Sequence, residues 1–148
     1  MESGTDSEAT EIPDSEHLAR YCGGAQIDED GNPNGVAFRP RPGEDYLSVN
    51  WLEYISPCCR QAQLTGLREV LSRKLSIGAT ARIAVSNCGN LRQHVESVSV
   101  DSRRLYFLHH PEPDDPSHAG VHNIVSEDHL VADLMAEACL EVYPARGS

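Results

Sequence analysis

The sequence predicts a single α+β domain, a two-layer sandwich in which about five short, mainly antiparallel strands carry two amphipathic helices on one face. Three observations lead to this prediction. Two segments have apolar residues at helical spacing, and several short runs rich in Val, Ile, Phe and Tyr accompany them. Clusters of Gly, Pro, Asn and Asp separate those runs, as turns do. The length of 148 residues suits one hydrophobic core.

The N-terminal part of the chain is strongly acidic. Residues 1–14 are predicted to be a disordered acidic tail, because they hold almost nothing to bury, and residues 15–148 to be the domain. Residues 1–30 contain nine Asp and Glu against one Arg, which is −8 of the total −11. The remaining body is nearly balanced and has no basic stripe. We therefore expect no nucleic-acid binding by the folded domain.

The first half of the body is expected to contain a short helix and a hairpin. The helix is expected over residues 15–21, after an Asp or Ser cap. Residues 22–35 are rich in Gly, Asn and Pro and are expected to form a loop. Residues 36–39 and 46–49 are expected to be paired strands, because the prolines within 40–45 exclude a helix between them.

Two longer helices have clear amphipathic patterns. Over residues 59–75, leucines and a valine recur at spacings of three and four. A final helix is expected to begin at Ser126, to carry an apolar stripe as far as Val142, and to be ended by Pro144.

Further short elements are expected between these two helices. Residues 79–85 are expected to form a strand, and a turn over 86–90 to open a short helix as far as Val95. Residues 98–100, 104–108 and 120–125 are expected to be strands, because apolar and β-branched residues are concentrated in them.

The chain carries no sign of a membrane span or a secretory leader. No apolar run approaches about 20 residues, and the N-terminus lacks a basic and then an apolar region. We expect a cytoplasmic protein with no membrane partner. The five cysteines form no Cys-x-x-Cys pair, and in the cytoplasm they are expected to be reduced thiols.

Four histidines and three carboxylates lie within residues 109–122. If the flanking segments pair as a hairpin, His109 or His110 lies close to His118 or His122. This pattern is typical of acid–base chemistry, with His118 as the general acid or base and His109 or His110 assisting. On a strand, His118 and His122 would lie about 13 Å apart, so no metal and no cofactor are predicted.

A second candidate for catalysis is Cys59, at the start of the helix over 59–75. A thiol at a helix N-terminus, beside Arg60, is stabilised as the nucleophilic thiolate. A helix cysteine followed by a strand histidine in 117–121 resembles the order in papain-like cysteine hydrolases, although their Gly- and Trp-bearing context around the cysteine is absent. The resemblance implies Cys59 as nucleophile and His118 as base.

Three arginines are candidates for anion binding. Arg39 and Arg41 flank Pro40, and Arg104 precedes an expected strand. A guanidinium can hold a phosphate or carboxylate through two parallel hydrogen bonds. The sequence has no glycine-rich phosphate loop, which disfavours nucleotide binding.

Aromatic and aliphatic residues are crowded into residues 49–55. No single element can bury Trp51, Tyr54 and Ile55 together with Leu52, so part of this segment is expected to be exposed. We therefore predict a small, non-catalytic interaction module that binds a larger protein or self-associates, through this segment or through an exposed sheet edge. The alternatives are a small hydrolase or transferase using the histidine loop, and a phosphate-ligand sensor using the arginines.

Overall fold

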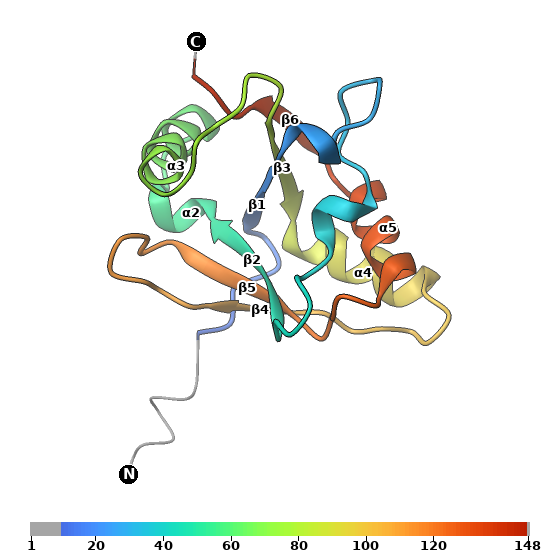
Figure 1. Cartoon of the computed structure of the whole chain (residues 1–148). Helices are drawn as coiled ribbons and strands as arrows, with labels where there is room; N and C mark the ends of the chain where they lie inside the picture. Colours follow the sequence, from blue (N-terminus) through green and yellow to red (C-terminus); the bar gives the residue numbers. More distant parts are fainter. Residues whose placement is uncertain (1–9, 148) are drawn as a thin grey trace.

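A computed structural model describes residues 10–147, which form an α+β sandwich around one antiparallel sheet (Figure 1). Within these residues the strand order is β4-β5-β2-β1-β3-β6. The strands are β1 (His17–Cys22), β2 (Tyr46–Trp51), β3 (Arg82–Asn87), β4 (Tyr106–His109), β5 (His118–His122) and β6 (Glu141–Pro144). The helices are α2 (Leu52–Ile55), α3 (Arg60–Lys74), α4 (Cys88–Val98), α5 (His129–Glu137) and the short 3₁₀ turns η1 (Gly24–Gln26) and η2 (Gly35–Phe38). The predicted α+β sandwich with antiparallel strands is confirmed.

The helices cover both faces of the sheet, whereas the sequence analysis placed the two amphipathic helices on one face. Helices α2 and α3 pack on one side, and α4, α5 and η2 pack on the other (Figure 1). The reason lies in the central strands, where Leu18 and Ala19 of β1 and Ala84 and Val85 of β3 are buried on opposite faces. A strand that is apolar on both sides needs a covering layer on each.

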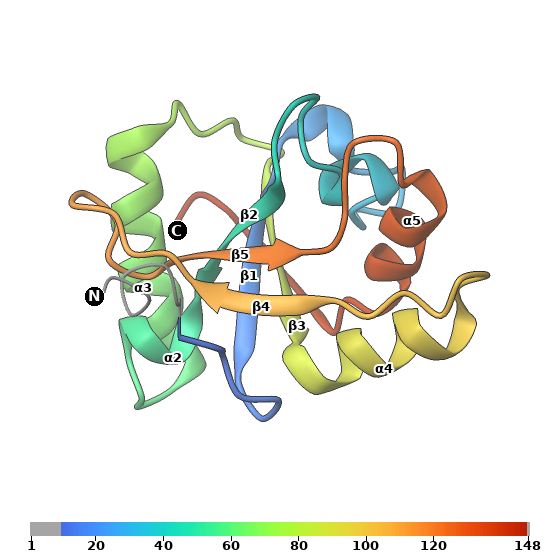
Figure 2. The same cartoon turned by 90° about the horizontal axis from the view of Figure 1, so that it is seen from below.

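The sheet opens between its two central strands. β1 pairs with β3 along six residues but with β2 at only two, Leu18 with Trp51 and Ala19 with Asn50. Beyond these pairs β2 turns away with β5 and β4, which cross the direction of β1 in Figure 2. Arg20 fills the resulting gap, donating from Nε to the Ala37 carbonyl at 2.7 Å and from Nη1 to the Ser48 carbonyl at 2.8 Å.

The end of the predicted acidic tail belongs to the folded domain. Ile12 is 1 % exposed, and its amide donates to the Phe107 carbonyl at 2.9 Å. The His109 amide donates to the Thr10 carbonyl at 2.8 Å, so residues 10–12 cover the outer edge of β4. The domain therefore begins earlier than residue 15, and residues 1–9 of the predicted tail lie outside the described part of the chain.

Several local predictions were wrong. Residues 17–22 form the central strand β1 rather than a helix, because pairing partners on both sides and burial on both faces outweigh the local cap signal. Residues 35–38 form η2, which packs against α5 instead of pairing as a strand. Residues 98–100 lie at the end of α4 and in the turn after it.

The last helix is shorter than predicted. α5 ends at Glu137, and the chain then joins the sheet when the Leu140 amide donates to the Val85 carbonyl at 2.9 Å. Val142 pairs with Ala84 in β6. The apolar pattern that predicted one helix as far as Val142 therefore belongs to a helix, α5, followed by an edge strand, β6.

The other predicted elements are confirmed, apart from their ends. These are β2, α3, β3, α4, β4 and β5. Over residues 10–147 no helix combines the length and the apolar character that a bilayer span requires.

Candidate functional site

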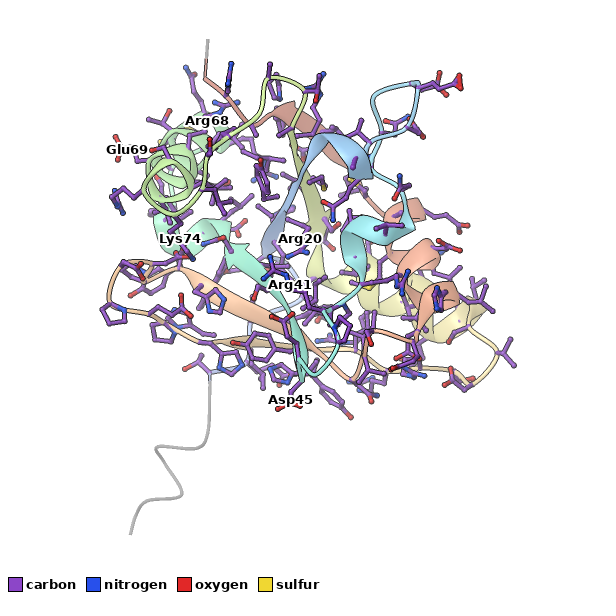
Figure 3. The ribbon with its side chains drawn as sticks, in the orientation of Figure 1. Arg20, Arg41, Asp45, Arg68, Glu69 and Lys74 are labelled. Carbon is purple, nitrogen blue, oxygen red and sulfur yellow. The ribbon has the colours of Figure 1, made fainter. Side chains whose placement is uncertain are left out.

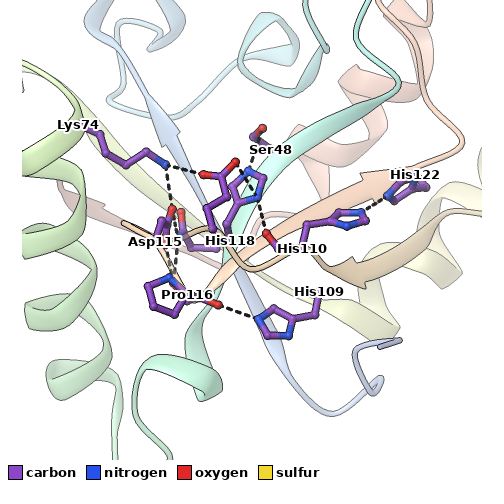
Figure 4. A network of polar contacts seen from close by, with 11 residues as sticks. Ser48, Lys74, His109, His110, Asp115, Pro116, His118 and His122 are labelled. Carbon is purple, nitrogen blue, oxygen red and sulfur yellow. Dashed lines mark hydrogen bonds and ion pairs between the residues drawn. The ribbon is translucent and has the colours of Figure 1, made fainter. Parts of the chain in front are cut away.

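The histidine loop is a hairpin that brings its flanking histidines together, as the sequence predicted. β4 and β5 pair antiparallel, with His109 opposite Ala119, and the His110 amide donates to the His118 carbonyl at 2.9 Å. The Nε2 atoms of His110 and His122 lie 2.7 Å apart (Figure 4). Because only one of these nitrogens can donate in that contact, the two rings share one proton between them.

Tyr46 organises these histidines. Its ring centroid lies 4.9 Å from those of both His110 and His122, and 6.1 Å from that of His118. The ring lies over Gly120, where a Cβ would come within 2.5 Å of the tyrosine Cδ1. Burial, and then the neighbouring imidazoles, lower the pKa of His110 and of His122 below the usual 6.5. Both environments therefore favour the neutral form of the ring.

His118 is held in one tautomer. Its side chain is buried, and Nδ1 lies 2.9 Å from the His110 carbonyl oxygen. Since a carbonyl can only accept, Nδ1 carries the proton and Nε2 is left as an acceptor. The hydroxyl of Ser48 lies 3.3 Å from Nε2, so Ser48 is the donor in this pair (Figure 4).

A buried carboxylate anchors the loop to β2 and α3. Asp115 is 0 % exposed and accepts from Asn50 Nδ2 at 2.8 and 3.1 Å, from Lys74 Nζ at 2.9 Å and from Ser117 Oγ at 3.1 Å. Each partner comes from a different element or from the loop itself. The network therefore fixes the position of β5, and with it His118.

His118 and Ser48 open into a cleft of about 790 Å³ between α3, η1 and the gap in the sheet. Arg20, Arg39 and Arg41 line the same cleft, and we call it the arginine cleft. Figure 3 places Arg20 and Arg41 beside one another, with Lys74 projecting from α3 towards them. Its other charged lining residues are Glu44 and Glu112.

Within residues 10–147 the three arginines of the cleft have no carboxylate partner, a property they share with Arg68, Arg73, Arg82 and Arg146. Arg60, Arg92 and Arg103 each pair with a carboxylate. Within residues 10–147, no carboxylate lies within 4 Å of the guanidinium groups of the arginine cleft, and Arg39 donates instead to the Ser126 carbonyl at 3.0 Å.

Arg20 shows the energetic consequence most clearly. Burial lowers the pKa of its guanidinium, and the nearby Cys22 and then Glu44 only partly oppose this effect. Taking a charge out of water is costly unless an opposite charge approaches it. An anion in the cleft would supply that charge.

Cys59 and His109 lie outside the arginine cleft. Cys59 is exposed at the start of α3, where a hydrogen bond from the Ala62 amide, and then one from Cys58, lower the pKa of its thiol. Across residues 10–147 no hydrogen bond joins Cys59 to a histidine, so the arrangement of papain-like hydrolases is not assembled. His109 Nε2 lies 2.7 Å from the Pro116 carbonyl oxygen, on the side of the loop away from Ser48.

Two other sets of predicted residues have different outcomes. Arg104 lies away from the arginine cleft and pairs with Glu96 at 3.4 Å. Of the aromatic segment, Tyr54 is 48 % exposed, Ile55 packs against α3, and Trp51 is half-buried with its Nε1 donating to Glu16 at 2.5 Å. Part of that segment is therefore exposed, at Tyr54.

Sequence reasoning missed Ser48, Arg20, Lys74 and Asp115. A faint signal existed for Ser48, a small polar residue between two apolar ones in a predicted strand, which places it on the opposite face from them. The other three lie far apart in the sequence: Arg20 and Lys74 come together on the arginine cleft, and Lys74 contacts Asp115, only in the folded chain.

No protein family, curated protein or solved structure matches this chain at a significant level. Over the described residues, no group of three or more His, Cys, Asp and Glu side chains is placed to hold a metal ion.

Proposed function

We propose that this chain binds a small molecule that carries a phosphate group, in the arginine cleft. The observation that carries the proposal is that three arginines, which have no carboxylate partner among residues 10–147, meet on one cleft in a chain of net charge −11. A phosphate dianion offers more charge and more acceptor oxygens than a carboxylate, which suits three guanidinium groups. A volume of about 790 Å³ lies within the range of small-molecule sites.

Calorimetric titration of the full chain with inorganic phosphate tests the proposal. Arg41→Gln removes an exposed cleft charge with little effect on folding, and we expect it to weaken binding about 10-fold, the value of one charged hydrogen bond. Arg73→Gln, on the exposed side of α3, is the matched control and should bind as the unaltered chain does. Absence of phosphate binding at millimolar concentration, or equal weakening by both variants, would contradict the proposal.

Protein interaction, the leading prediction from the sequence, is a second proposal, and a different surface favours it. Val98, Val100, Leu130 and Leu134 line a groove of about 640 Å³ between the end of α4 and α5, and Val100 is 96 % exposed. We call it the aliphatic groove. Among the described residues that line it, five carry carboxylates, Asp101, Glu127, Asp128, Asp133 and Glu137, and Arg103 is the one arginine. A second copy would bring two acidic rims together, so the fitting partner is a basic amphipathic helix.

Fluorescence anisotropy with a labelled model helix tests this second proposal. A Leu- and Lys-patterned peptide should bind, and Leu130→Ser should weaken its binding at least about 5-fold, because a central apolar contact is lost. The matched control is Val36→Ser, another exposed apolar position, outside the groove. If both substitutions have the same effect, or if a Leu- and Glu-patterned peptide binds equally well, the groove is not the docking surface.

A further inference from the structure

We infer that Ser48 is a nucleophile activated by His118, so that the arginine cleft hydrolyses a phosphate ester. This inference rests on the proposed function, since it assigns chemistry to the phosphate that the arginines would hold. Neither the histidine loop by itself nor Cys59 supplies this arrangement. The pair exists only because β2 and β5 are neighbours, with Ser48 directly opposite Gly120 and two residue pairs along the strands from His118, which is opposite Asn50.

The geometry has the three parts that an activated serine requires. The hydroxyl of Ser48 faces Nε2 of His118 at 3.3 Å, and the carbonyl of His110 holds the opposite ring nitrogen as the donor at 2.9 Å. A nucleophile, a base within reach and a group that orients the base form the arrangement found in serine hydrolases. A contact of 3.3 Å is long for a hydroxyl donor, and such contacts shorten when a substrate binds.

The surroundings of Ser48 suit attack on phosphorus. Arg20 donates to the Ser48 carbonyl at 2.8 Å, so one guanidinium both positions the nucleophilic residue and places positive charge beside it. Arg41 lines the same cleft. Positive charge held next to the non-bridging oxygens stabilises the negative charge of the phosphoryl group in the transition state.

The reaction balances without a metal or a redox partner. The Ser48 oxygen forms a bond to phosphorus while its proton passes to His118 Nε2, and the bond from phosphorus to the leaving alkoxide or phenoxide breaks. The protonated His118 returns that proton to the leaving oxygen, which departs as the alcohol or phenol. Water then attacks the phosphorus while His118 Nε2 takes its proton, and the bond from phosphorus to the Ser48 oxygen breaks. His118 returns the proton to that oxygen, which restores the serine hydroxyl and releases inorganic phosphate.

Two measurements on the full chain test the inference. The first is labelling with an alkyl fluorophosphonate, in which the Ser48 oxygen displaces fluoride, followed by peptide mass mapping. We expect the label on Ser48, and this result does not depend on any variant folding. The second is turnover of p-nitrophenyl phosphate by Ser48→Ala and His118→Asn, each of which should lower kcat at least about 100-fold. Because the two groups act as one unit, the double variant should be no slower than the slower single variant.

Controls separate this inference from the proposed function. Ser97→Ala removes an exposed hydroxyl on α4 and should leave turnover unchanged. Ser48→Ala keeps all the arginines and should still bind inorganic phosphate. Phosphate binding without label on Ser48, or Ser48→Ala with unaltered turnover, overturns the catalytic inference and leaves the binding proposal intact. Label on Ser48 without phosphate binding supports the serine–histidine pair and overturns the binding proposal.

Discussion

Gly120 has a specific structural task, which is to leave room for the ring of Tyr46. The aromatic ring of one strand lies over the missing side chain of its neighbour, and this packing holds His110 and His122 against the same tyrosine. A glycine in a strand interior normally weakens the strand because it packs nothing. Here the cross-strand tyrosine supplies the packing in its place.

Gly120→Ala should therefore destabilise the domain. The new methyl group would meet Tyr46 at 2.5 Å and His110 Cδ2 at 3.0 Å, so the ring must move. We expect a loss of about 1–3 kcal/mol in the free energy of unfolding, the usual cost of overpacking, measured by urea denaturation. Gly78→Ala is the control, since a Cβ there has no atom of the described residues within 4 Å. Equal effects of the two substitutions would show that Tyr46 does not depend on Gly120.

At the scale of the elements, one buried carboxylate joins a loop, a strand and a helix. Asp115 belongs to the loop before β5, and its partners Asn50 and Lys74 belong to β2 and α3. This connection holds the strand that carries His118 beside β2, where the His118 ring reaches the Ser48 hydroxyl. A loop that carries functional groups must be fixed by its scaffold if those groups are to be positioned accurately.

Asp115→Asn should loosen this connection. The substitution removes the negative charge that faces the Lys74 ammonium. It also places the new amide NH2 group, a donor, against the Nδ2 donor of Asn50. Breaking a fully buried ion pair costs about 3–5 kcal/mol. Because Lys74 is partly exposed, we expect the free energy of unfolding to fall by about 2–3 kcal/mol, measured by thermal or urea denaturation. Asp114→Asn, an exposed position in the same loop, should change stability by less than about 0.5 kcal/mol. A similar loss in both variants would assign the effect to the loop in general.

At the scale of the whole molecule, the sheet consists of two halves that meet at a short seam. β6, β3 and β1 form one half, β2, β5 and β4 form the other, and two residue pairs join them. The arginine cleft lies where the halves part. Cationic residues are concentrated in this cleft although the chain as a whole is acidic. The cleft therefore attracts an anion only locally, over about a Debye length, roughly 8 Å at physiological salt.

Much of the fold could be predicted from local sequence patterns. The helix over 60–74 and the strand over 46–51 have periodicities that one element satisfies by itself. The histidine hairpin was also predictable, because a proline-rich loop between two apolar runs favours a reversal of the chain. Errors arose where one pattern fits two structures, as in residues 17–22 and 141–144, which become strands because neighbours from distant parts of the chain pair with them.

By itself the sequence determined the fold class, the main helices and the hairpin that brings the histidines of its two arms together, whereas the structure decided that His110 meets His122. The tertiary structure alone decided the candidate site. Its residues are spread along the chain from position 20 to position 118 and share no motif: Arg20, Ser48, Lys74 and His118. They meet through strand order, the opening between β1 and β2, and the docking of α3. Local sequence patterns indicate which face of a helix or strand is apolar. Which polar side chains come together depends on how the helices and strands are assembled.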